Sequence, residues 1–429
     1  MSFKLKVITN LIALRFYRKL YRVNLFRLQS RRWKKLNRTL LLSPFYKDLA
    51  LKGTQIEKYP IINKSIFMEN FDLINTRGVK RDEAFDVAIK AETSRDFSPM
   101  IDDVTIGLSS GTCGNRGVFL ATEEERAQWV ACILDRVIGF SLKKRTVAFF
   151  LRANSNLYDS VRSNILQFEF FDLLDPLDAH IGRLNVLNPN LLVAQPSLLT
   201  ELAKKKEEGE LKISPQKIIS VAEVLYPEDM VYLESIFGQR IHQVYQCTEG
   251  FLAATCAHGT LHFNEDFLII EKKYIDETNM RFHPVITDLL RITQPVIRYE
   301  LNDIIHEKKD CPCGSSMIGI DKIEGRSDDI LIFESTGNEI IKIFPDFFTR
   351  AIIMSNGSIK DYALVQSDRK ELSLYIDGTR EIFEQAKNAI QLLLKENGIT
   401  DLEIIRSETR PNEKGNKLRR VRNDFRKTN

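Results

Sequence analysis

The sequence has 429 residues, which is enough chain for two or three domains of about 150 residues each. Apolar residues make up 43% of it, Gly and Pro occupy only 20 and 13 positions, and six cysteines are far fewer than a stapled secreted domain needs, so collagen-like, disordered and disulfide-scaffold proteins are excluded. The net charge of +4 is unevenly distributed, because residues 1–40 contain twelve Lys or Arg and no acid, residues 409–429 contain eight bases and two acids, and the segment between carries −14. This composition predicts a cytoplasmic globular protein with an acidic body and two basic ends.

The basic N-terminal segment predicts one long amphipathic helix over residues 1–40. No apolar run approaches the roughly 20 residues of a membrane span and no cleavage pattern follows, so neither a transmembrane helix nor a signal peptide is expected. We expect the apolar face to pack on the domain and the basic face to be solvated or to lie against the acidic body, with binding to an anionic membrane surface as the alternative. Nucleic acid is not an expected partner, because no nucleic-acid-binding module accompanies the charge. The apolar positions at helical spacing are Ile8, Leu11, Ile12, Phe16, Leu20 and Tyr21, and the basic positions are Arg15, Arg18, Lys19 and Arg22.

Residues 41–327 alternate between strand-like and helix-like patterns. Apolar runs predict strands at 145–151, 217–221 and 240–245, and amphipathic patterns predict helices at 196–206 and 227–237. Alternating strands and helices predict a largely parallel sheet covered by helices. We therefore expect an α/β large domain over 41–327.

After about residue 328 the pattern changes to a smaller set of elements. Helices are predicted at 344–354 and 380–396, and strands at 361–366, 371–376 and 402–406. This order is typical of a compact α+β unit of about 100 residues. We assign residues 328–429 to it.

The strongest local motif is a glycine-rich segment at 108–117. Glycines let backbone N–H groups turn toward one anion, and hydroxyl groups and a cation complete such a shell. The segment therefore suits a polyphosphate, although a surface turn has the same composition. It lacks the Gly-Lys-Ser/Thr ending of a Walker loop, which argues against a P-loop NTPase. Its candidate phosphate-binding residues are Ser109, Ser110, Gly111, Thr112, Gly114 and Arg116.

Three later segments offer groups that suit the rest of a nucleotide. Tyr245, Thr248 and Glu249 supply an aromatic face for a base, a hydroxyl for phosphate and a carboxylate for Mg²⁺. Asp303 can accept from both hydroxyls of a ribose, and residues 323–330 place a cation and two acids at the expected domain boundary. Each segment alone is also compatible with a turn, a cap or a surface pair, so the hypothesis depends on their joint order.

Five segments, in their order along the chain, resemble the motifs of the acyl-adenylate-forming superfamily: SSGTCG, VAE at 221–223, YQCTE, PVIRYELND and IEGRSDDI. Within it the chain is most similar to the branch of phenylacetate–CoA ligases and deazaflavin-coenzyme adenylating synthetases. The resemblance covers about residues 45–425 and implies a large adenylation domain followed by a small mobile C-terminal lid domain.

The resemblance implies a role for each residue of the nucleotide motifs. The segment 109–117 is expected to hold the β- and γ-phosphates of ATP. Tyr245 is expected to stack on adenine beside the backbone at Ala222 and Glu223, and Thr248 to contact phosphate.

The remaining motif residues are expected to serve the reaction itself. Glu249 corresponds to the family's Mg²⁺ ligand and Asp303 to the acid that binds the ribose. Arg326 is similar to the arginine that contacts ribose and phosphate, and Asp328 to the hinge about which the small domain rotates.

A lysine in the basic tail is implied as a catalytic residue. The family's tail reads Gly-Lys-x-x-Arg, and here Lys417 precedes Arg420 by three, although the nearest glycine is at 415. We therefore prefer Lys417 to Lys414. In the phosphate loop the family's lysine is missing, and Arg116 can replace its charge because guanidinium binds phosphate well.

Cysteines and histidines in two further segments suggest a metal site. Cys311 and Cys313 are close to zinc-ligand spacing, and Pro and Gly beside them favour a tight turn. With Cys256 and one histidine of the segment 256–262 they would form a closed structural site; the alternative is a buried cysteine and an exposed turn. Related ligases have a similar set, which favours His262 over His258.

Taken together, the motifs and the resemblance predict an enzyme that activates an aromatic or fatty carboxylic acid with ATP, releases pyrophosphate and passes the acyl group to CoA or another thiol. Such an enzyme would use ATP, Mg²⁺ and CoA, with a structural Zn²⁺ as an addition. Two alternatives stay open: adenylation of a hydroxyl-bearing cofactor, and a non-catalytic ATP-binding scaffold. The sequence identifies neither the acid nor the acceptor.

Overall fold

The computed structural model describes residues 1–21, 24–94, 96, 99–108, 117–139, 143–151, 166–172, 175–275, 277–326, 329–335, 339–359, 361–411 and 419–425. The chain divides into two compact units. Unit 1 consists of Met1–Ser110, Arg116–Leu301 and His306–Lys322, and unit 2 of Gly111–Asn115, Asn302–Ile305 and Ile323–Asn429.

The main sheet of the described chain has twelve strands in the order β11-β12-β14-β15-β10-β9-β8-β7-β6-β4-β5, with β13 beside β12. From β5 to β8 the neighbouring strands are parallel. These strands are β4 (Arg145–Leu151), β5 (Leu166–Asp172), β6 (Leu191–Ala194), β7 (Lys217–Ser220) and β8 (Ile241–Cys247).

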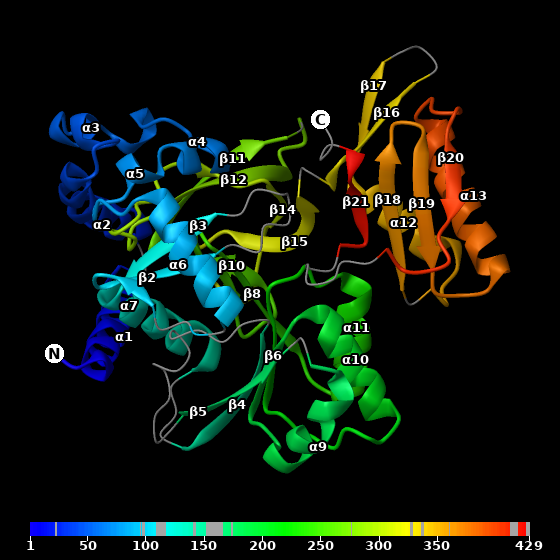
Figure 1. Ribbon diagram of the computed structural model, residues 1–429, viewed down its shortest axis with the longest axis horizontal. Helices are drawn as coiled ribbons and strands as arrows, with labels where there is room; N and C mark the ends of the chain where they lie inside the picture. Colours follow the sequence, from blue (N-terminus) through cyan, green and yellow to red (C-terminus); the bar gives the residue numbers. More distant parts are fainter. Residues whose placement is uncertain are drawn as a thin grey trace. The chain divides into compact units, whose positions relative to one another are not determined.

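Helices cover the parallel strands on a face that forms one apolar core with them (Figure 1). They are α9 (Leu177–Leu187), α10 (Pro196–Glu207) and α11 (Pro227–Phe237). Proline at the first turn begins α10 and α11, and Gly238 in the left-handed conformation ends α11, as expected for helix termini. The predicted alternation of strands and helices is confirmed in this region.

Beyond β8 the sheet is antiparallel, so the expectation of a largely parallel sheet holds only for its first half. Strand β9 (Gly250–Thr255) pairs antiparallel with both β8 and β10. Connections of two to five residues cannot carry the chain back for a parallel pairing, which needs a crossover of a dozen or more residues. The other strands are β10 (Leu261–Phe263), β11 (Leu268–Tyr274), β12 (Arg281–Asp288), β13 (Tyr299–Glu300), β14 (Asp303–Lys308) and β15 (Gly319–Arg326).

A small antiparallel sheet, β1-β2-β3, forms a second layer of unit 1 and shares a core with α6 (Arg81–Ser94). Its last strand leads directly into α7 (Glu123–Ile133), whose start has a capping box made by Thr122 and Glu125. The strands are β1 (Met100–Ile101), β2 (Val104–Leu108) and β3 (Val118–Thr122). Short helical segments precede them: η1 (Leu40–Leu42), α3 (Lys47–Leu51), η2 (Ile56–Lys58), α4 (Lys64–Glu69) and α5 (Phe71–Ile74), and η3 (Leu134–Ile138) follows α7.

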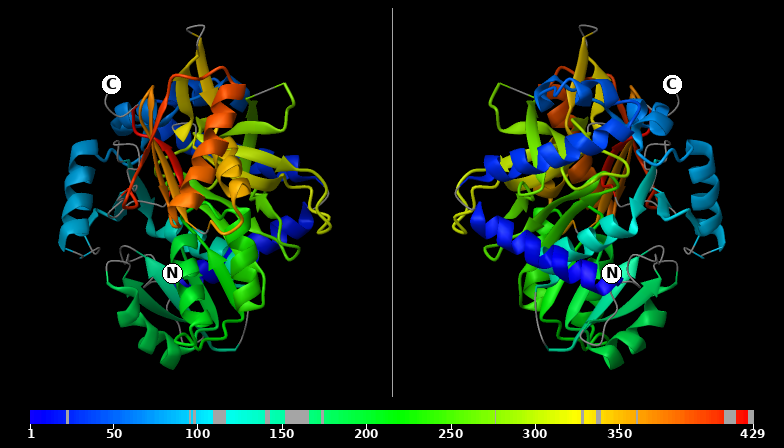
Figure 2. Two further views of the ribbon diagram at one scale, coloured as in Figure 1. Left: turned by 90° about the vertical axis from the view of Figure 1, so that its right-hand side faces the viewer. Right: turned by 90° about the vertical axis from the view of Figure 1, so that its left-hand side faces the viewer.

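The N-terminal segment forms two helices, so the prediction of one helix over residues 1–40 is wrong. Helix α1 (Phe3–Leu20) ends before α2 (Leu25–Thr39), and both lie on the side of unit 1 that faces the viewer in the right-hand view of Figure 2. Asn24 begins α2, because its side chain accepts a hydrogen bond from the backbone N–H of Arg27 at 3.0 Å. Asparagine is among the best residues for this capping position, and this explains why a new helix starts there.

The faces of α1 are also not those expected from its sequence. Val7, Leu11 and Leu14 are buried, and the helix packs against α7. Of the two expectations for the basic face, contact with the acidic body holds for Arg15 and Arg18, which both bind Asp135, at 2.9 and 2.5 Å. The apolar residues Ile8, Ile12, Phe16 and Leu20, which were expected to pack on the domain, are exposed. Helical periodicity indicates which residues share a face but not which face is covered.

Unit 2 is built on a four-stranded sheet of order β20-β19-β18-β21. Its strands share an apolar core with α12 and α13. The elements are β18 (Tyr362–Asp368), β19 (Glu371–Ile376), β20 (Glu403–Arg406), β21 (Val421–Asn423), α12 (Pro345–Ser355) and α13 (Arg380–Glu396). The sequence patterns predicted all of these except β21; they also missed the hairpin of β16 (Leu331–Glu334) and β17 (Ile340–Ile343).

Asp135 anchors α1, and its removal should destabilise the protein. Its side chain is 2% exposed, and although burial raises the pKa of a carboxyl, hydrogen bonds from Arg18 and Arg15 outweigh that effect and lower the pKa. We expect Asp135→Asn to reduce the free energy of unfolding by about 1–3 kcal/mol, because two partly exposed guanidinium groups lose their carboxylate.

The measurement is urea unfolding at neutral pH, with Asp82→Asn as the control because Asp82 is 89% exposed. Since the folded-state pKa of Asp135 is lowered, its stabilising effect is present above the unfolded-state pKa of about 4 and is lost as the pH falls through the folded-state value. Equal stability of the two variants at neutral pH would contradict the anchoring role.

Candidate functional site

The β8–β9 hairpin carries three of the predicted nucleotide residues. Tyr245 lies in β8, and Thr248 and Glu249 form the two-residue turn between the strands. The pairing shifts register between Tyr245 and Gln246, which marks a bulge just before the turn. Bulges re-aim side chains and are frequent next to functional sites.

Two hydroxyl groups hold the carboxylate of Glu249. Thr248 donates to its Oε2 and Tyr299 donates to its Oε1, each at 2.9 Å. Burial raises the pKa of a carboxyl, but hydrogen bonds from Thr248, Cys247 and Tyr299 outweigh that effect and lower the pKa of Glu249. The carboxylate of Glu249 is therefore ionised and half-buried. Carboxylate oxygens of this kind are ligands that Mg²⁺ prefers.

The segment that follows β7 lies beside Tyr245. Ser220 pairs with Gln243 as the last pair between β7 and β8, and Ala222 and Tyr245 each lie two residues further along their chains. Ala222 has a positive φ of 69°, and the carboxylate of Glu223 accepts from the backbone N–H of Ser197 at 3.3 Å. Ala222 and Glu223 follow the carboxyl end of β7, and Tyr245 lies near the carboxyl end of the adjacent parallel strand β8. Open α/β sheets bind ligands at such ends.

Two residues that the sequence analysis missed connect this hairpin to β3. Arg291 donates to the backbone carbonyl of Thr248 and, at 3.0 Å, to Oε1 of Gln294. The same Oε1 accepts from the N–H of Leu120 at 3.1 Å, and Nε2 of Gln294 donates to the carbonyl of Val118 at 3.2 Å. Because β3 directly follows the predicted phosphate loop, Arg291 and Gln294 join the exit of that loop to the Thr248–Glu249 turn.

One sequence signal could have revealed Gln294. Gln294 is 1% exposed and directly precedes the apolar run 295–297, where an amide needs a specific partner. A polar side chain buried at such a position needs hydrogen-bond partners, and here the partners are backbone groups of β3.

Several predicted site residues lie outside the described part of the chain. This applies to the phosphate loop (Ser109, Ser110, Gly111, Thr112, Gly114 and Arg116), to Asp328, to both candidate lysines, Lys414 and Lys417, and to the side chain of Arg326. Arg326 ends β15, and Asp303 begins β14. By the division into units, Asp303 belongs to unit 2 and Glu249 to unit 1.

Within unit 2, the residues beside the predicted hinge and beside the predicted lysine contact each other. Asp329 follows Asp328, and its Oδ1 accepts from Arg419 at 2.6 Å with both side chains largely buried. Arg419 in turn stands two residues after Lys417. A further bond runs from the amide of Asn423 to the carbonyl of Ile330 at 2.9 Å. Residues 419–423 are thus attached to residues 329–330 within unit 2.

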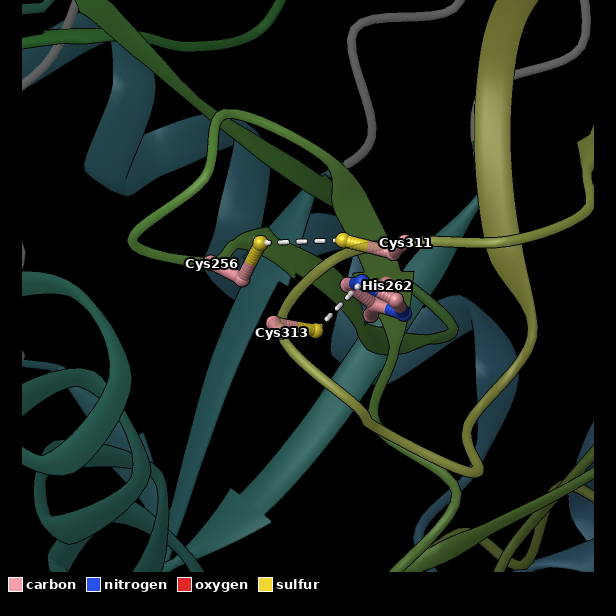
Figure 3. Close-up of side chains that lie close together, drawn as sticks. All are labelled: Cys256, His262, Cys311 and Cys313. Carbon is pink, nitrogen blue, oxygen red and sulfur yellow. Dashed lines mark hydrogen bonds between the residues drawn. The ribbon is translucent and has the colours of Figure 1, made fainter.

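The four predicted zinc ligands come together in unit 1 (Figure 3). Cys256 follows β9, His262 lies in β10, and Cys311 and Cys313 lie in the turn before β15. Their ligand atoms are all within 4.8 Å of one another. Sγ of Cys256 is 3.7 Å from Sγ of Cys311, and Sγ of Cys313 is 3.4 Å from Nε2 of His262.

The distances of 3.7 and 3.4 Å are close to two of the six edges of a zinc tetrahedron. Zn–S bonds of about 2.3 Å and Zn–N bonds of about 2.0–2.1 Å give S···S edges near 3.8 Å and S···N edges near 3.6 Å. The other ring nitrogen of His262, Nδ1, lies 3.0 Å from the carbonyl of Met317, a contact that leaves Nε2 free to bind a metal. His258 is exposed and is not part of the cluster.

Comparison with solved structures identifies proteins of the same fold. A 2-hydroxyisobutyryl-CoA ligase in the postadenylation state, in complex with R3-HIB-AMP, superposes on this chain with a TM-score of 0.64 at 17% sequence identity. The superposition covers 94% of this chain and 90% of the ligase. A benzoate CoA ligase from Burkholderia xenovorans LB400 superposes over 75% of this chain and 69% of its own length, with a TM-score of 0.53 at 16% identity. The anthranilate CoA ligase AuaEII in complex with anthranoyl-AMP superposes over 73% of this chain and 66% of its own length, with a TM-score of 0.53 at 11% identity. No protein-family model and no curated protein matches the sequence. The chain therefore has the fold of these CoA ligases.

Gln294 should be needed for the stability of the region around the site. We expect Gln294→Ala to lower the free energy of unfolding by roughly 1–3 kcal/mol, because it leaves the N–H of Leu120 and the carbonyl of Val118 without their partner inside the protein. Chemical unfolding measures the change, and Gln385→Ala serves as the control because Gln385 is exposed on α13. Unchanged stability of the first variant would show that water replaces the amide.

Proposed function

We propose that the protein is an acid–CoA ligase that converts a carboxylic acid to an acyl-adenylate with ATP and then transfers the acyl group to CoA or another thiol. The observation that carries the proposal is the likeness over 94% of the chain to a CoA ligase whose structure contains an acyl-AMP, together with the predicted adenine residues at the carboxyl ends of β7 and β8. As the finer part of the proposal, we assign it to the branch of phenylacetate–CoA ligases and deazaflavin-coenzyme adenylating synthetases, which the resemblance of its sequence motifs supports. Aromatic and fatty acids are the substrate classes that we propose.

The first half-reaction would need charge stabilisation and no protein nucleophile. A carboxylate oxygen attacks the α-phosphorus, the bond to the bridging oxygen of pyrophosphate breaks, and a mixed anhydride with AMP forms. Lys417 and Arg326 would oppose the negative charge that accumulates on the α-phosphate. Glu249 would hold Mg²⁺, which supplies further positive charge at the phosphates when it is bound.

Binding of the nucleotide would come from the other motif residues. The loop at 109–117 would surround the terminal phosphates, Tyr245 would stack on adenine beside Ala222 and Glu223, and Thr248 would contact phosphate. Asp303 would accept from the ribose hydroxyls.

In the second half-reaction the thiol attacks the carbonyl carbon and AMP leaves. Rotation of the small domain about Asp328 would remove Lys417 and admit the acceptor, so that one domain serves both steps. The ion pair between Asp329 and Arg419 supports this proposal, because it attaches the tail to the hinge side of unit 2. The lysine would then move with the domain.

We further propose a structural zinc ion bound by Cys256, His262, Cys311 and Cys313. Three thiolates and one imidazole leave no open position for substrate, which is the arrangement of structural sites. Burial raises the pKa of a thiol, but hydrogen bonds from Thr260, the backbone at Cys313 and His262 outweigh that effect at Cys311 and lower its pKa to about 5. Burial and the neighbouring thiols of Cys311 and Cys256 raise the pKa of Cys313, so the thiolate is favoured at Cys311 and not at both cysteines of this pair.

Pyrophosphate exchange tests the proposed adenylation. Purified protein with Mg²⁺-ATP should exchange labelled pyrophosphate into ATP only in the presence of its acid, and Lys417→Ala should reduce the rate by at least about 100-fold, because one preorganised cation at the developing charge contributes that much. Lys414→Ala is the matched control, in the same segment, and should retain exchange.

The outcomes separate the alternatives. No exchange with any member of a panel of aromatic and fatty acids would favour an ATP-binding scaffold, and exchange that depends on a hydroxyl compound in place of an acid would favour the cofactor adenylation. Loss of exchange in Lys414→Ala alone would transfer the catalytic role to Lys414.

Metal analysis tests the zinc proposal. The full chain should contain stoichiometric zinc, and Cys311→Ser should lose it with a lower melting temperature, because three ligands cannot close the tetrahedron. Cys247→Ser, which lies outside the cluster, should retain the metal. Zinc retained in full by the Cys311 variant, or none in the unaltered protein, would be incompatible with the site.

A further inference from the structure

Helix α1 exposes a long apolar stripe that the proposed reaction does not use. The side chains of Leu5, Ile8, Ile12, Phe16 and Leu20 are 50%, 52%, 63%, 59% and 58% exposed. Their spacing of three or four residues places them on one face of the helix. At 1.5 Å per residue, the stripe is about 22 Å long. Monomeric proteins rarely leave a contiguous apolar surface of this kind uncovered.

The orientation of the stripe is fixed by the opposite side of α1. Val7, Leu11 and Leu14 are buried, and the helix packs on α7. Lys6 pairs with Glu124 at 2.8 Å and Glu123 at 3.1 Å at the start of α7. Because the anchored face cannot turn outward without breaking these contacts, the stripe (Leu5, Ile8, Ile12, Phe16 and Leu20) is directed to solvent.

Helix α2 contributes a basic stripe next to it. Arg27, Arg31, Lys34 and Arg38 follow the spacing i, i+4, i+7, i+11 and line a groove together with Phe26. The opposite face of α2 is held by the buried Leu28 and Leu36 and by the side chain of Gln29, which donates to the carbonyls of Glu265 and Leu268, both at 2.9 Å. Among the residues that the structure describes, Arg27, Lys34 and Arg38 have no acidic partner.

Arg31 of the basic stripe contacts Tyr17, which directly follows Phe16 of the apolar stripe in α1. The guanidinium of Arg31 lies 4.8 Å from the ring centre of Tyr17 and donates to its hydroxyl at 3.1 Å. The right-hand view of Figure 2 shows α1 and α2, both dark blue, on the same side of unit 1. Residues 1–40 contain no acid, so α1 and α2 themselves contribute only apolar, cationic and neutral polar side chains to this surface.

We propose that α1 and α2 attach unit 1 to the surface of an anionic lipid bilayer. The apolar stripe would enter the boundary between headgroups and acyl chains, and the basic stripe would contact lipid phosphates. A nucleic acid would use the cations and leave the apolar stripe in water, so it fits only half of the surface. An anionic bilayer presents charged headgroups directly above its apolar acyl chains, so it fits both the basic stripe and the apolar stripe. This inference does not depend on the proposed reaction.

Vesicle co-sedimentation of the full chain tests the proposal. We expect the protein to bind phosphatidylcholine vesicles that contain phosphatidylglycerol, to bind vesicles of phosphatidylcholine alone at least about tenfold more weakly, and to be released by high salt, because salt screens surface charges. Equal binding to both kinds of vesicle, or no binding to either, would overturn it.

Two sets of variants separate the two stripes. The triple variant Ile8→Ser, Ile12→Ser, Phe16→Ser should bind anionic vesicles at least about tenfold more weakly, since it removes the groups that enter the lipid. Its control is Val186→Ser, Val231→Ser, Leu392→Ser, which changes apolar side chains that are 90%, 67% and 59% exposed elsewhere and should bind as before.

The charge variant Arg27→Glu, Lys34→Glu, Arg38→Glu should bind on the order of 100-fold more weakly, because each basic residue near an anionic surface contributes roughly fivefold. Lys52→Glu, Lys90→Glu, Lys212→Glu makes the same change of net charge at exposed positions outside α1 and α2 and should bind as before. Equal weakening by both charge variants would show attraction by net charge alone and would contradict a defined surface.

Fluorescence gives a measurement that does not rely on loss of binding. When anionic vesicles are added, the emission of the Phe16→Trp variant should shift to shorter wavelength by more than that of the unaltered protein, which has two tryptophans, because the new ring leaves water. Unchanged emission from vesicle-bound protein would place the stripe outside the lipid and overturn the proposal. Circular dichroism and melting temperature establish that each variant is folded.

Discussion

The change from parallel to antiparallel pairing at the β8–β9 hairpin is the constraint on which the candidate site depends. From β5 to β8 the chain returns through a helix after each strand, so the carboxyl ends of β6, β7 and β8 lie at one edge. The hairpin then reverses the chain within two residues and holds Thr248 and Glu249 at that same edge. A carboxylate can therefore lie beside the residues that follow β7 without a long loop to position it.

The second strand of that hairpin connects the two candidate sites. One end of β9 follows Glu249 and the other precedes Cys256, and a strand of six residues spans about 20 Å. Gly250 follows the turn directly, and a Cβ there would lie 3.0 Å from a carboxylate oxygen of the buried Asp288, so no larger residue fits without displacing that side chain. A metal bound at the far end of β9 would hold β10 and the turn before β15 in register, and so support the strand that presents Glu249.

The sequence predicted elements best where local pattern and tertiary role agree. Helix α13 and strand β19 begin and end where expected, because each has one buried face and clear boundary residues. The faces of α1 could not be predicted, because an amphipathic pattern is satisfied by either a covered or an uncovered apolar side, and only the position of α7 decides between them. Likewise Gln294 carries no motif, and its role follows from two backbone groups of β3 that lie 174 and 176 residues away in the chain.

The two basic ends of the chain, similar in composition, differ in what their charges do. In unit 2, Arg419 binds Asp329 and Arg420 lies over the ring of Tyr362, so these cations stabilise the fold of the small unit. In unit 1, Arg15 and Arg18 are likewise paired with a buried acid, whereas the basic residues of the α2 groove face solvent. Pairing within the fold thus accounts for part of the charge at each end. The exposed remainder in α2 lies next to an apolar stripe, and that combination distinguishes a surface for lipid from ordinary surface charge.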